Sequence, residues 1–257
     1  MAFYDLSPAE RADLCRNIYE GLLNNLRAGS TAYFAQIFND ADTYIRKAGY
    51  LATGKIYKEH AALAHTILDT LGLLMDSPHH PIRQTTVNAA GEIGKYDFEQ
   101  VRAFFDKGLF DTHHTVRNAA IGSVKKMGEK NPAPVLEWAK AYLHHPDKEI
   151  RREICHGIEL RGRTHPEDIL PLLKELEHDA TARVKNTLVH VIGQISYKKG
   201  CLEKVITHLQ QWENKTLAAK AIEEIIDVHY RYRNFSYYTQ DEAISIINNL
   251  NAAKPAI

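Results

Sequence analysis

The stretch that decides the fold is "HHTVR", His113 to Arg117, which lies 34 residues after "HHPIR", His79 to Arg83. A looser copy, "HHPDKEIR", runs from His144 to Arg151. Each copy ends in an aliphatic residue followed by arginine. The recurrence has two interpretations: a set of histidine ligands, or one structural unit that repeats along the chain. Whether the chain contains a structural repeat has to be established before any single motif is interpreted.

The aliphatic–basic pair recurs beyond these three copies. Its first member, counted below as position 0 of a repeat, is found at Ile45, Ile82, Val116, Ile150 and Val184. The intervals between these residues are 37, 34, 34 and 34. A nearly constant period in this range is typical of an α-solenoid, in which each repeat is a pair of helices.

Apolar residues follow each pair with helical spacing. Positions 0, +4, +8 and often +11 are aliphatic or small, as in Ile150, Ile154 and Ile158, and such positions share one face of a helix. Position +7 holds small residues, which predicts the close approach of a neighbouring helix: Ala52, Ala89, Ser123 and Gly157. Each repeat is therefore expected to end in a second helix that buries this stripe.

The stretches between these second helices also have a helical pattern. Residues 131–143 begin with Asn131 as an expected N-cap and Pro132 at the first helical position. No stretch alternates with a period of two. Helix pairs of this length, with an aspartate ahead of the aliphatic–basic pair, resemble HEAT repeats.

The sequence thus predicts an all-α fold, a right-handed α-solenoid of HEAT-like helical repeats with about six helix pairs. We expect a single domain over residues 1–257. It is divided into N-terminal capping helices over 1–40, core repeats over 41–212 and C-terminal capping helices over 213–257.

The composition limits the class of protein. The 32 basic and 32 acidic side chains cancel, which argues against a protein coated in positive charge. The three cysteines are far apart and form no CxxC pair, which favours a reducing compartment. The N-terminal stretch has no apolar core of a signal peptide, and no apolar run is long enough for a membrane span. We therefore expect a cytoplasmic protein with no membrane partner.

Charged residues ahead of and within the pairs suggest an internal ladder. In four repeats an aspartate precedes the pair: Asp42, Asp111, Asp147 and Asp179. The second repeat has histidines at this place instead. We predict that the acid of one repeat pairs with the base of the next. The alternative for Arg83, Arg117 and Arg151 is contact with a ligand.

The paired histidines fall in the expected turn before each second helix. Adjacent residues point in different directions, so both members of a pair rarely bind one ion, and no cysteine or carboxylate recurs at ligand spacing. We predict that six histidines lie in turns and bind no structural metal: His79, His80, His113, His114, His144 and His145. No metal site and no cofactor is expected. A repeat hydroxylase with His-Glu metal ligands is disfavoured as well, because the sequence contains no His-Glu dipeptide.

Positions +2, +6 and +9 of the second helices form what we call the polar stripe, which is rich in Asn, Gln, His, Arg and Gly. Because Asn and Gly are poor helix formers, their recurrence in register suggests a concave surface that contacts a ligand. The alternative is that these residues only permit tight packing. The expected groove residues are Gln84, Asn88, Asn118, Arg152, His156, Arg163, Asn186 and His190.

Residues 131–200 carry a further resemblance. The segments "NPAPVLEWAKAYL", "IRREICHG" and "RVKNTLVHVIGQI" are similar to those of bacterial DNA alkylation repair glycosylases built from HEAT-like repeats. That resemblance implies a basic groove that binds duplex DNA around an N-alkylated purine. It also implies a carboxylate that stabilises the oxocarbenium-like sugar.

The chain departs from that family at the expected acid. His156 stands where one subgroup has a glutamate. Glu159 or Glu153, each within one turn of it, could substitute, and Glu159 is the candidate catalytic residue. Glu159 also has an i,i+4 partner in Arg163, which competes for the carboxylate. We therefore predict weak or absent glycosylase activity.

Residues 229–243 interleave aromatic side chains with two arginines. Such a segment can stack on bases and bind phosphates. The alternative is a connection between the last two helices, with Thr239 and Glu242 as a capping box.

Two functions follow from these patterns. The polar stripe and the resemblance favour a module that binds nucleic acid, with duplex DNA as the partner. The neutral net charge favours the alternative, a protein–protein interaction scaffold without enzymatic activity. A bilin-lyase-like HEAT protein stays open as well. A continuous positive groove would support DNA, and a groove of mixed charge would support a protein partner.

Overall fold

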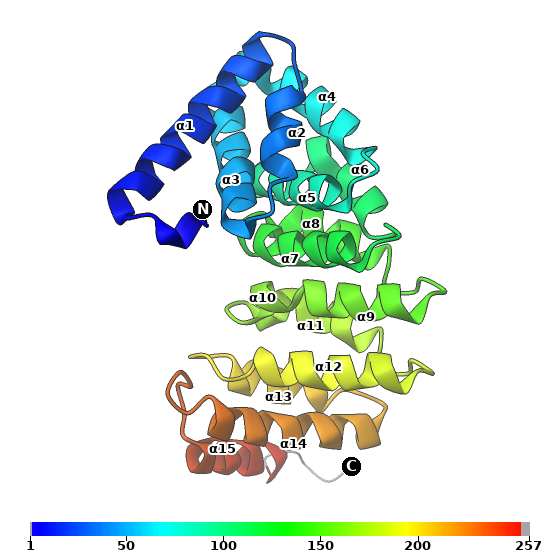
Figure 1. Cartoon of the computed structure of the whole chain (residues 1–257). Coiled ribbons are helices and arrows are strands. Elements are labelled where there is room, and N and C mark those ends of the chain that lie inside the picture. The colour runs from blue at the N-terminus through cyan, green and yellow to red at the C-terminus, as the bar shows by residue number, and fades with distance from the viewer. Residues whose placement is uncertain (1, 253–257) are drawn as a thin grey trace. The chain divides into compact units, whose positions relative to one another are not determined.

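The computed structural model describes residues 2–252, and these residues form helices joined by short turns, with no strand among them (Figure 1). Contacts divide the chain into two compact units, Met1–Asn131 (unit 1) and Pro132–Ile257 (unit 2). The sequence predicts one continuous domain, and the boundary between the units falls inside its expected core repeats. It coincides with Asn131 and Pro132, where the sequence predicts a helix start.

In unit 1 the second helices α3, α5 and α7 pack side by side, and α1 packs against α3. The helices of this unit are η1 (Phe3–Asp5), α1 (Pro8–Arg27), α2 (Ala32–Phe38), α3 (Thr43–Glu59), η2 (Ala61–Leu63), α4 (Ala64–Met75), α5 (His80–Gly94), α6 (Phe98–Gly108) and α7 (His114–Lys130). Helices α2, α4 and α6 form the other member of each pair (Figure 1).

In unit 2 the second helices α9, α12 and α14 form one layer, and α11, α13 and α15 form the other (Figure 1). The helices of this unit are α8 (Pro132–Lys140), α9 (Lys148–Gly157), α10 (Glu159–Gly162), α11 (Pro166–Lys174), α12 (Ala182–Gln194), α13 (Leu202–Leu209), α14 (Lys215–Arg231) and α15 (Gln240–Ala252). This arrangement confirms the all-α class and the helix-pair repeats.

The expected apolar stripe forms the core of both units. On α7, for example, Val116, Ala120, Val124 and Met127 all have 0% exposure. Helix α14 is a sixth second helix, and the buried Leu217 is at its position 0. The next residue is Ala218 instead of a basic residue. The aliphatic–basic pair therefore does not mark α14, which the sequence assigns to the C-terminal capping helices.

The five repeats share a turn that the sequence pattern does not show. A side chain five residues before position 0 accepts a hydrogen bond of 2.7–3.2 Å from the backbone N–H two residues later. The accepting residues are Asp40, Ser77, Asp111, His145 and Asp179. Short polar side chains that accept such bonds hold the chain in the turn that starts a helix.

The arginines of the repeat bind within the protein, as the ladder predicts. Nη1 of Arg83 donates to the carbonyl groups of Ser77 and Pro78, six and five residues earlier. Arg46, Arg117 and Arg151 repeat this pattern. The other two nitrogens of the Arg83 guanidinium donate to Asp111: Nε to Oδ2 at 2.7 Å and Nη2 to Oδ1 at 2.8 Å.

The order of the ladder is the reverse of the prediction. Asp111 and Asp179 each pair with the arginine of the preceding repeat, Arg83 and Arg151 respectively. Asp42 and Asp147 are not part of the ladder, because they cap the N-termini of α3 and α9 instead. The ladder aspartates lie five residues before position 0, whereas the cap aspartates lie three residues before it. Aligning the repeats on any acid near the pair overlooks this difference.

The histidine pairs lie at the turns, where the sequence places them. His79 and His113 are the N-cap residues of α5 and α7. The ring of His80 stacks on that of His113, with the centroids 3.6 Å apart and an interplanar angle of 4°. His145 accepts the backbone N–H of Asp147. These contacts account for the histidines as turn residues.

Candidate functional site

The polar stripe of unit 1 borders a hollow between α3 and α5. Gln84 and Asn88, two of the expected groove residues, line it together with Lys47 and Tyr50, and its volume is about 300 Å³. Amide side chains offer both hydrogen-bond donors and acceptors to a ligand. Asn118, on α7, is exposed.

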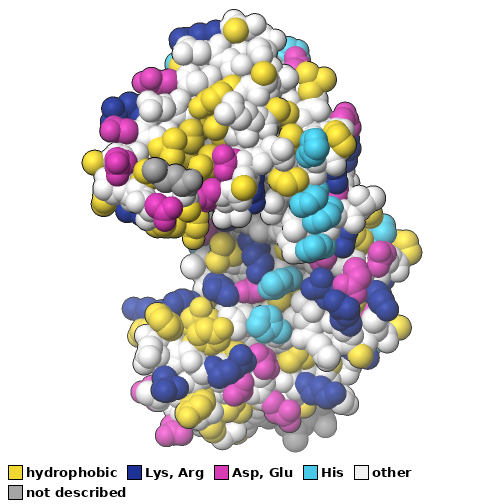
Figure 2. Space-filling view, in the orientation of Figure 1, with side chains coloured by type: hydrophobic (Ala, Val, Ile, Leu, Met, Phe, Trp, Pro, Cys, Tyr) yellow, Lys and Arg dark blue, Asp and Glu magenta, His cyan; other side chains and the backbone are white. Residues whose placement is uncertain are grey.

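A second hollow of unit 1 lies between α1 and α3 and is mostly apolar. Leu51, at position +6 of the stripe, lines it with Cys15, Tyr19, Ala48 and other residues, and its volume is about 420 Å³. Leu51 keeps 43% of its surface exposed. Hydrophobic side chains gather on this side of unit 1 over α1 and α3 (Figure 2). The polar pattern of the stripe does not predict this hollow, and the sequence signal for it is Leu51, an apolar residue in an otherwise polar stripe.

Unit 2 repeats the arrangement on a smaller scale. Asn186, at position +2 of α12, lines a hollow of about 200 Å³ between α12 and α14. Lys185, Asn214 and Lys220 line it as well. In both units, therefore, stripe residues border hollows between neighbouring second helices.

Part of the stripe has a packing role instead. A Cβ on Gly91 would lie 2.6 Å from Cβ of Ser123, and one on Gly54 would lie 2.5 Å from Cβ of Glu92. Gly193 is equally close to the side chain of Glu224. The glycines at position +9 thus permit close approach of the next second helix.

The arginines on the second-helix face of unit 2 are paired with carboxylates. Arg152 donates from Nε to Glu149 at 2.9 Å and from Nη2 to Glu153 at 3.3 Å. Arg183 also reaches Glu149, at 3.2 Å. Figure 2 shows basic and acidic side chains interspersed on the visible face of this unit. The charge of this surface is mixed rather than continuously positive.

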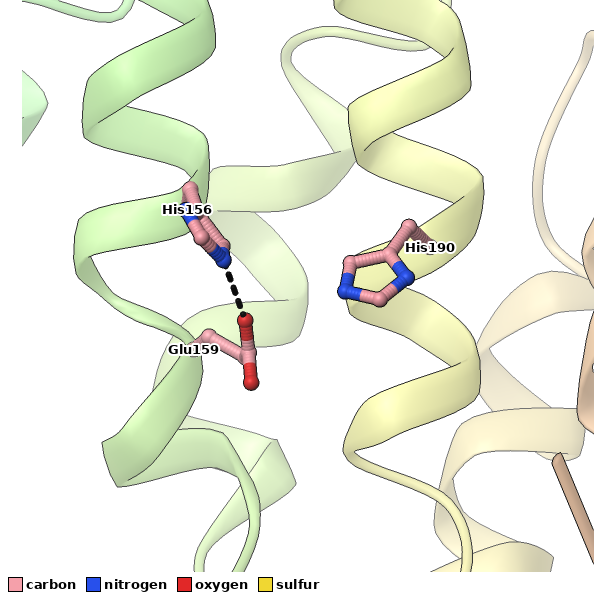
Figure 3. A group of neighbouring side chains, drawn as sticks. All are labelled: His156, Glu159 and His190. Atoms are coloured by element: carbon pink, nitrogen blue, oxygen red, sulfur yellow. Dashed lines mark ion pairs between the residues drawn. The ribbon is translucent and has the colours of Figure 1, made fainter. Parts of the chain in front are cut away.

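Three further predicted residues come together around Glu159, the first residue of α10 (Figure 3). Its side chain is only 3% exposed. Oε1 accepts two hydrogen bonds from Arg163, at 3.1 and 2.5 Å, and Oε2 lies 3.1 Å from Nε2 of His156. His190 projects from the neighbouring helix α12 toward the same carboxylate (Figure 3).

The surroundings of His190 hold its imidazole between two acids. Burial lowers the pKa of His190, and Glu159 and Glu224 oppose that shift without reversing it. Nδ1 of His190 lies 3.9 Å from Oε1 of Glu224 on α14. The repeat spacing predicts His156 and His190 in one stripe, but it does not predict that both rings lie near the Glu159 carboxylate.

The aromatic segment before α15 closes the end of unit 2. Thr239 and Glu242 form the expected capping box, with hydrogen bonds of 2.8 and 3.3 Å. The ring of Tyr232 stacks on that of Tyr197 at 5.4 Å. Phe235 and Tyr237 remain exposed, at 68% and 52%. The capping box and the stacking of Tyr232 on Tyr197 thus hold the connection between the last two helices in place.

Comparisons with known proteins support the fold and no individual function. No protein-family model and no curated protein matches the chain. The N-terminal domain of MAST/Orbit is similar, with a TM-score of 0.52 and 16% identity over 76% of this chain and 96% of that domain. This likeness shows a helical-repeat fold.

Two other solved structures align with lower TM-scores. One is a HEAT-like repeat protein of Thermococcus onnurineus NA1, with a TM-score of 0.45 and 14% identity over 87% of this chain and 97% of that one. The other is the CpcE–CpcF complex of phycocyanin lyase from Nostoc sp. PCC7120, with a TM-score of 0.33 and 14% identity over 88% of this chain and 95% of that one.

The resemblance to alkylation repair glycosylases gains no support from these comparisons. It rests on the motifs of residues 131–200 alone, and those motifs coincide with the general pattern of the repeat. No helix among residues 2–252 combines the length and the apolar character that crossing a membrane requires.

Proposed function

We propose that the chain is a protein-interaction module that binds a partner on the second-helix faces of its repeats. The observation that carries the proposal is the position of the hollows. Stripe residues line them at corresponding places in both units, and the hollow between α1 and α3 is mostly apolar. Apolar hollows flanked by polar groups are typical of sites for protein side chains.

The two hollows of unit 1 lie on either side of α3 and suggest how a partner would bind. The apolar one, at Leu51, suits a hydrophobic side chain of the partner. The other offers the amides of Gln84 and Asn88, which can bond to the peptide groups of the same segment. A short segment with one hydrophobic anchor fits both.

The charges favour protein over duplex DNA. DNA binding draws much of its free energy from basic side chains that contact phosphates and release counterions. Arg152 and Arg163 would first have to leave Glu149, Glu153 and Glu159. Breaking such pairs costs free energy, and the nearby carboxylates repel phosphate. The DNA-binding function that the stripe and the resemblance suggest therefore has weaker support than the scaffold.

The proposal can be tested by selecting short peptides from a displayed random library on the whole protein and measuring the affinity of the selected peptides by fluorescence anisotropy. We expect hydrophobic peptides that lose at least tenfold in affinity with Leu51→Glu, because a carboxylate in the apolar hollow stays unsatisfied. Asn88→Ala should weaken binding less.

Leu73→Glu is the matched control, because Leu73 is also an exposed leucine, at 68%, but lies on α4 outside the stripe. It should leave the affinity unchanged. Selected peptides that respond equally to both leucine variants, or only to Leu73→Glu, would contradict the proposed face.

A further inference from the structure

We propose that His156, Glu159 and His190 form a binding site for a divalent transition metal ion, with Zn²⁺ as the ion of best fit. Each residue offers one donor atom, and these atoms all lie within 4.8 Å of one another. The three side chains point toward a common space between α9–α10 and α12 (Figure 3). The proposal departs from the expectation that the chain has no metal site, and it does not rest on the proposed function.

The geometry requires only a small closure. Donor atoms bound to one tetrahedral Zn²⁺ at about 2.0–2.2 Å are about 3.4 Å apart. Nε2 of His156 and Oε2 of Glu159 are already 3.1 Å apart, so His190 supplies most of the movement. Its side chain is 44% exposed and can change rotamer at little cost.

The chemistry of the donors selects the kind of ion. Two imidazoles and one carboxylate suit zinc and related transition metals better than Mg²⁺ or Ca²⁺, which prefer oxygen ligands. Three protein ligands leave a coordination position open, as in catalytic rather than structural zinc sites. Water or a group from a partner could fill that position.

Charged side chains surround the three residues and one of them, Arg163, already holds a ligand. Arg163 holds Oε1 of Glu159 and leaves Oε2 directed at His156. Oε1 of Glu224 is held by Arg231 at 2.5 Å and lies 3.9 Å from Nδ1 of His190, so a small shift of the imidazole as Nε2 binds the ion would bring Nδ1 within hydrogen-bond distance. Carboxylates in this position orient the histidine ligands of metal sites.

Another group of ligand-type residues, Glu177, His178 and Glu213, serves as an internal comparison. Oε2 of Glu177 accepts the backbone N–H of Glu213 at 2.9 Å, so this carboxylate is engaged in holding a turn. His178 and Glu213 are exposed, at 60% and 79% for their side chains. Two of these three ligands are more exposed than any ligand of the proposed site and would lose more side-chain freedom on binding an ion, so this group is the poorer metal site.

The test is metal titration of the full chain after removal of any histidine tag. Zn²⁺ binding is measured by competition with a chromophoric chelator, and Co²⁺ binding by its visible ligand-field absorption. We expect one ion per chain, and an affinity at least tenfold weaker in His190→Ala. His178→Ala, the matched control, should bind like the wild type.

The variants must be compared as folded proteins, which circular dichroism without metal establishes. His190→Ala is the first choice because His190 is half-exposed, whereas Glu159→Gln disturbs a buried carboxylate. If His190→Ala does not fold, His156→Ala replaces it. Absence of binding at millimolar metal, or binding that His190→Ala leaves unchanged, overturns the proposal.

Discussion

At the scale of single residues, the histidines of this chain occupy distinct environments. His113 and His145 accept backbone N–H groups at turns, and His156 meets a buried carboxylate. His229, on α14, is fully buried. Its Nδ1 bonds to the carbonyl of Ile225 at 2.8 Å, while Nε2 is buried and has no hydrogen-bond partner among the described residues.

His229 makes stability depend on pH. Burial lowers its pKa, although the bond to Ile225 opposes the shift. Well above about pH 6.5, the ordinary pKa of histidine, this residue is neutral in both the folded and the unfolded state and stability does not change with pH on its account. As pH falls below that value, the unfolded state gains a proton that the folded state resists, and stability drops by up to about 1.4 kcal/mol per pH unit.

Denaturant unfolding at pH 7.5 and pH 5.5 measures this contribution. His229→Leu should lose less stability between the two pH values than the wild type does. A remaining slope is expected, because burial also lowers the pKa of His190 and His208. An identical drop in both proteins would show that His229 is protonated as readily in the folded state as in the unfolded state.

Glu159 carries a second prediction at this scale. A carboxylate that is 3% exposed and bonded to Arg163 and His156 is poorly placed to stabilise a sugar cation. We expect no release of 3-methyladenine or 7-methylguanine from methylated duplex DNA above the rate without protein. Robust release that Glu159→Gln abolishes would instead identify Glu159 as a catalytic residue.

At the scale of helices, the spacing between neighbouring second helices depends on a few small residues. Gly91 of α5 faces Ser123 of α7 closely, whereas a Cβ on Gly122 of α7 would have no atom within 4 Å. The two glycines belong to the same unit and to helices that pack on each other. They differ mainly in the space around them.

Substitution by alanine should therefore have opposite effects at the two positions. Gly91→Ala forces α5 and α7 apart and should cost about 1–3 kcal/mol. Gly122→Ala meets open space and should gain about 0.5–1 kcal/mol, since glycine is a poor helix former. Chemical denaturation of both variants checks this, and a stabilising Gly91→Ala would refute the close packing.

The ladder pairs join consecutive repeats through side chains that are mostly buried. Arg83 and Asp111 keep only 14% and 7% of their side-chain surface exposed. Burial alone would raise the pKa of Asp111, but the bonds from Arg83 and from the backbone N–H of His113 bring it below its usual value. The carboxylate is thus ionised and committed to this junction.

Asp111→Ala should destabilise the protein by about 3–5 kcal/mol, because it leaves a buried guanidinium without its partner. Asp13→Ala is the control in the same unit: the Arg16–Asp13 pair is 65% and 62% exposed, and its loss should cost less than about 1 kcal/mol. Thermal and denaturant unfolding give both values. Equal costs would mean that the ladder is no stronger than a surface pair.

At the scale of the whole molecule, the balance of 32 basic and 32 acidic side chains sets the interaction with nucleic acid. We expect weak binding to duplex DNA at low salt, and Arg152→Ala should change the affinity less than twofold, because Arg152 already has carboxylate partners. Anisotropy at two salt concentrations measures this. Tight binding whose salt slope falls by about one unit in Arg152→Ala would favour a DNA-binding function.

The periodicity alone determined the fold class. A 34-residue interval and apolar positions at 0, +4 and +8 specify helix pairs and their buried faces, because both depend on local spacing along the chain. The same spacing located the turns that hold the paired histidines. The sequence also placed Gln84, Asn88, Asn186 and His190 on one kind of helix face, which the structure shows beside hollows or beside Glu159.

Only the tertiary structure decided which stripe residues pack and which border a hollow. Gly91 and Asn88 belong to the same stripe, but one contacts the next helix and the other lines a hollow. The meeting of His190 with Glu159 depends on the offset between α12 and α10, which no spacing within one repeat encodes. Contacts between helices depend on the fit of side chains from separate repeats, and a sequence pattern read one helix at a time does not contain that fit.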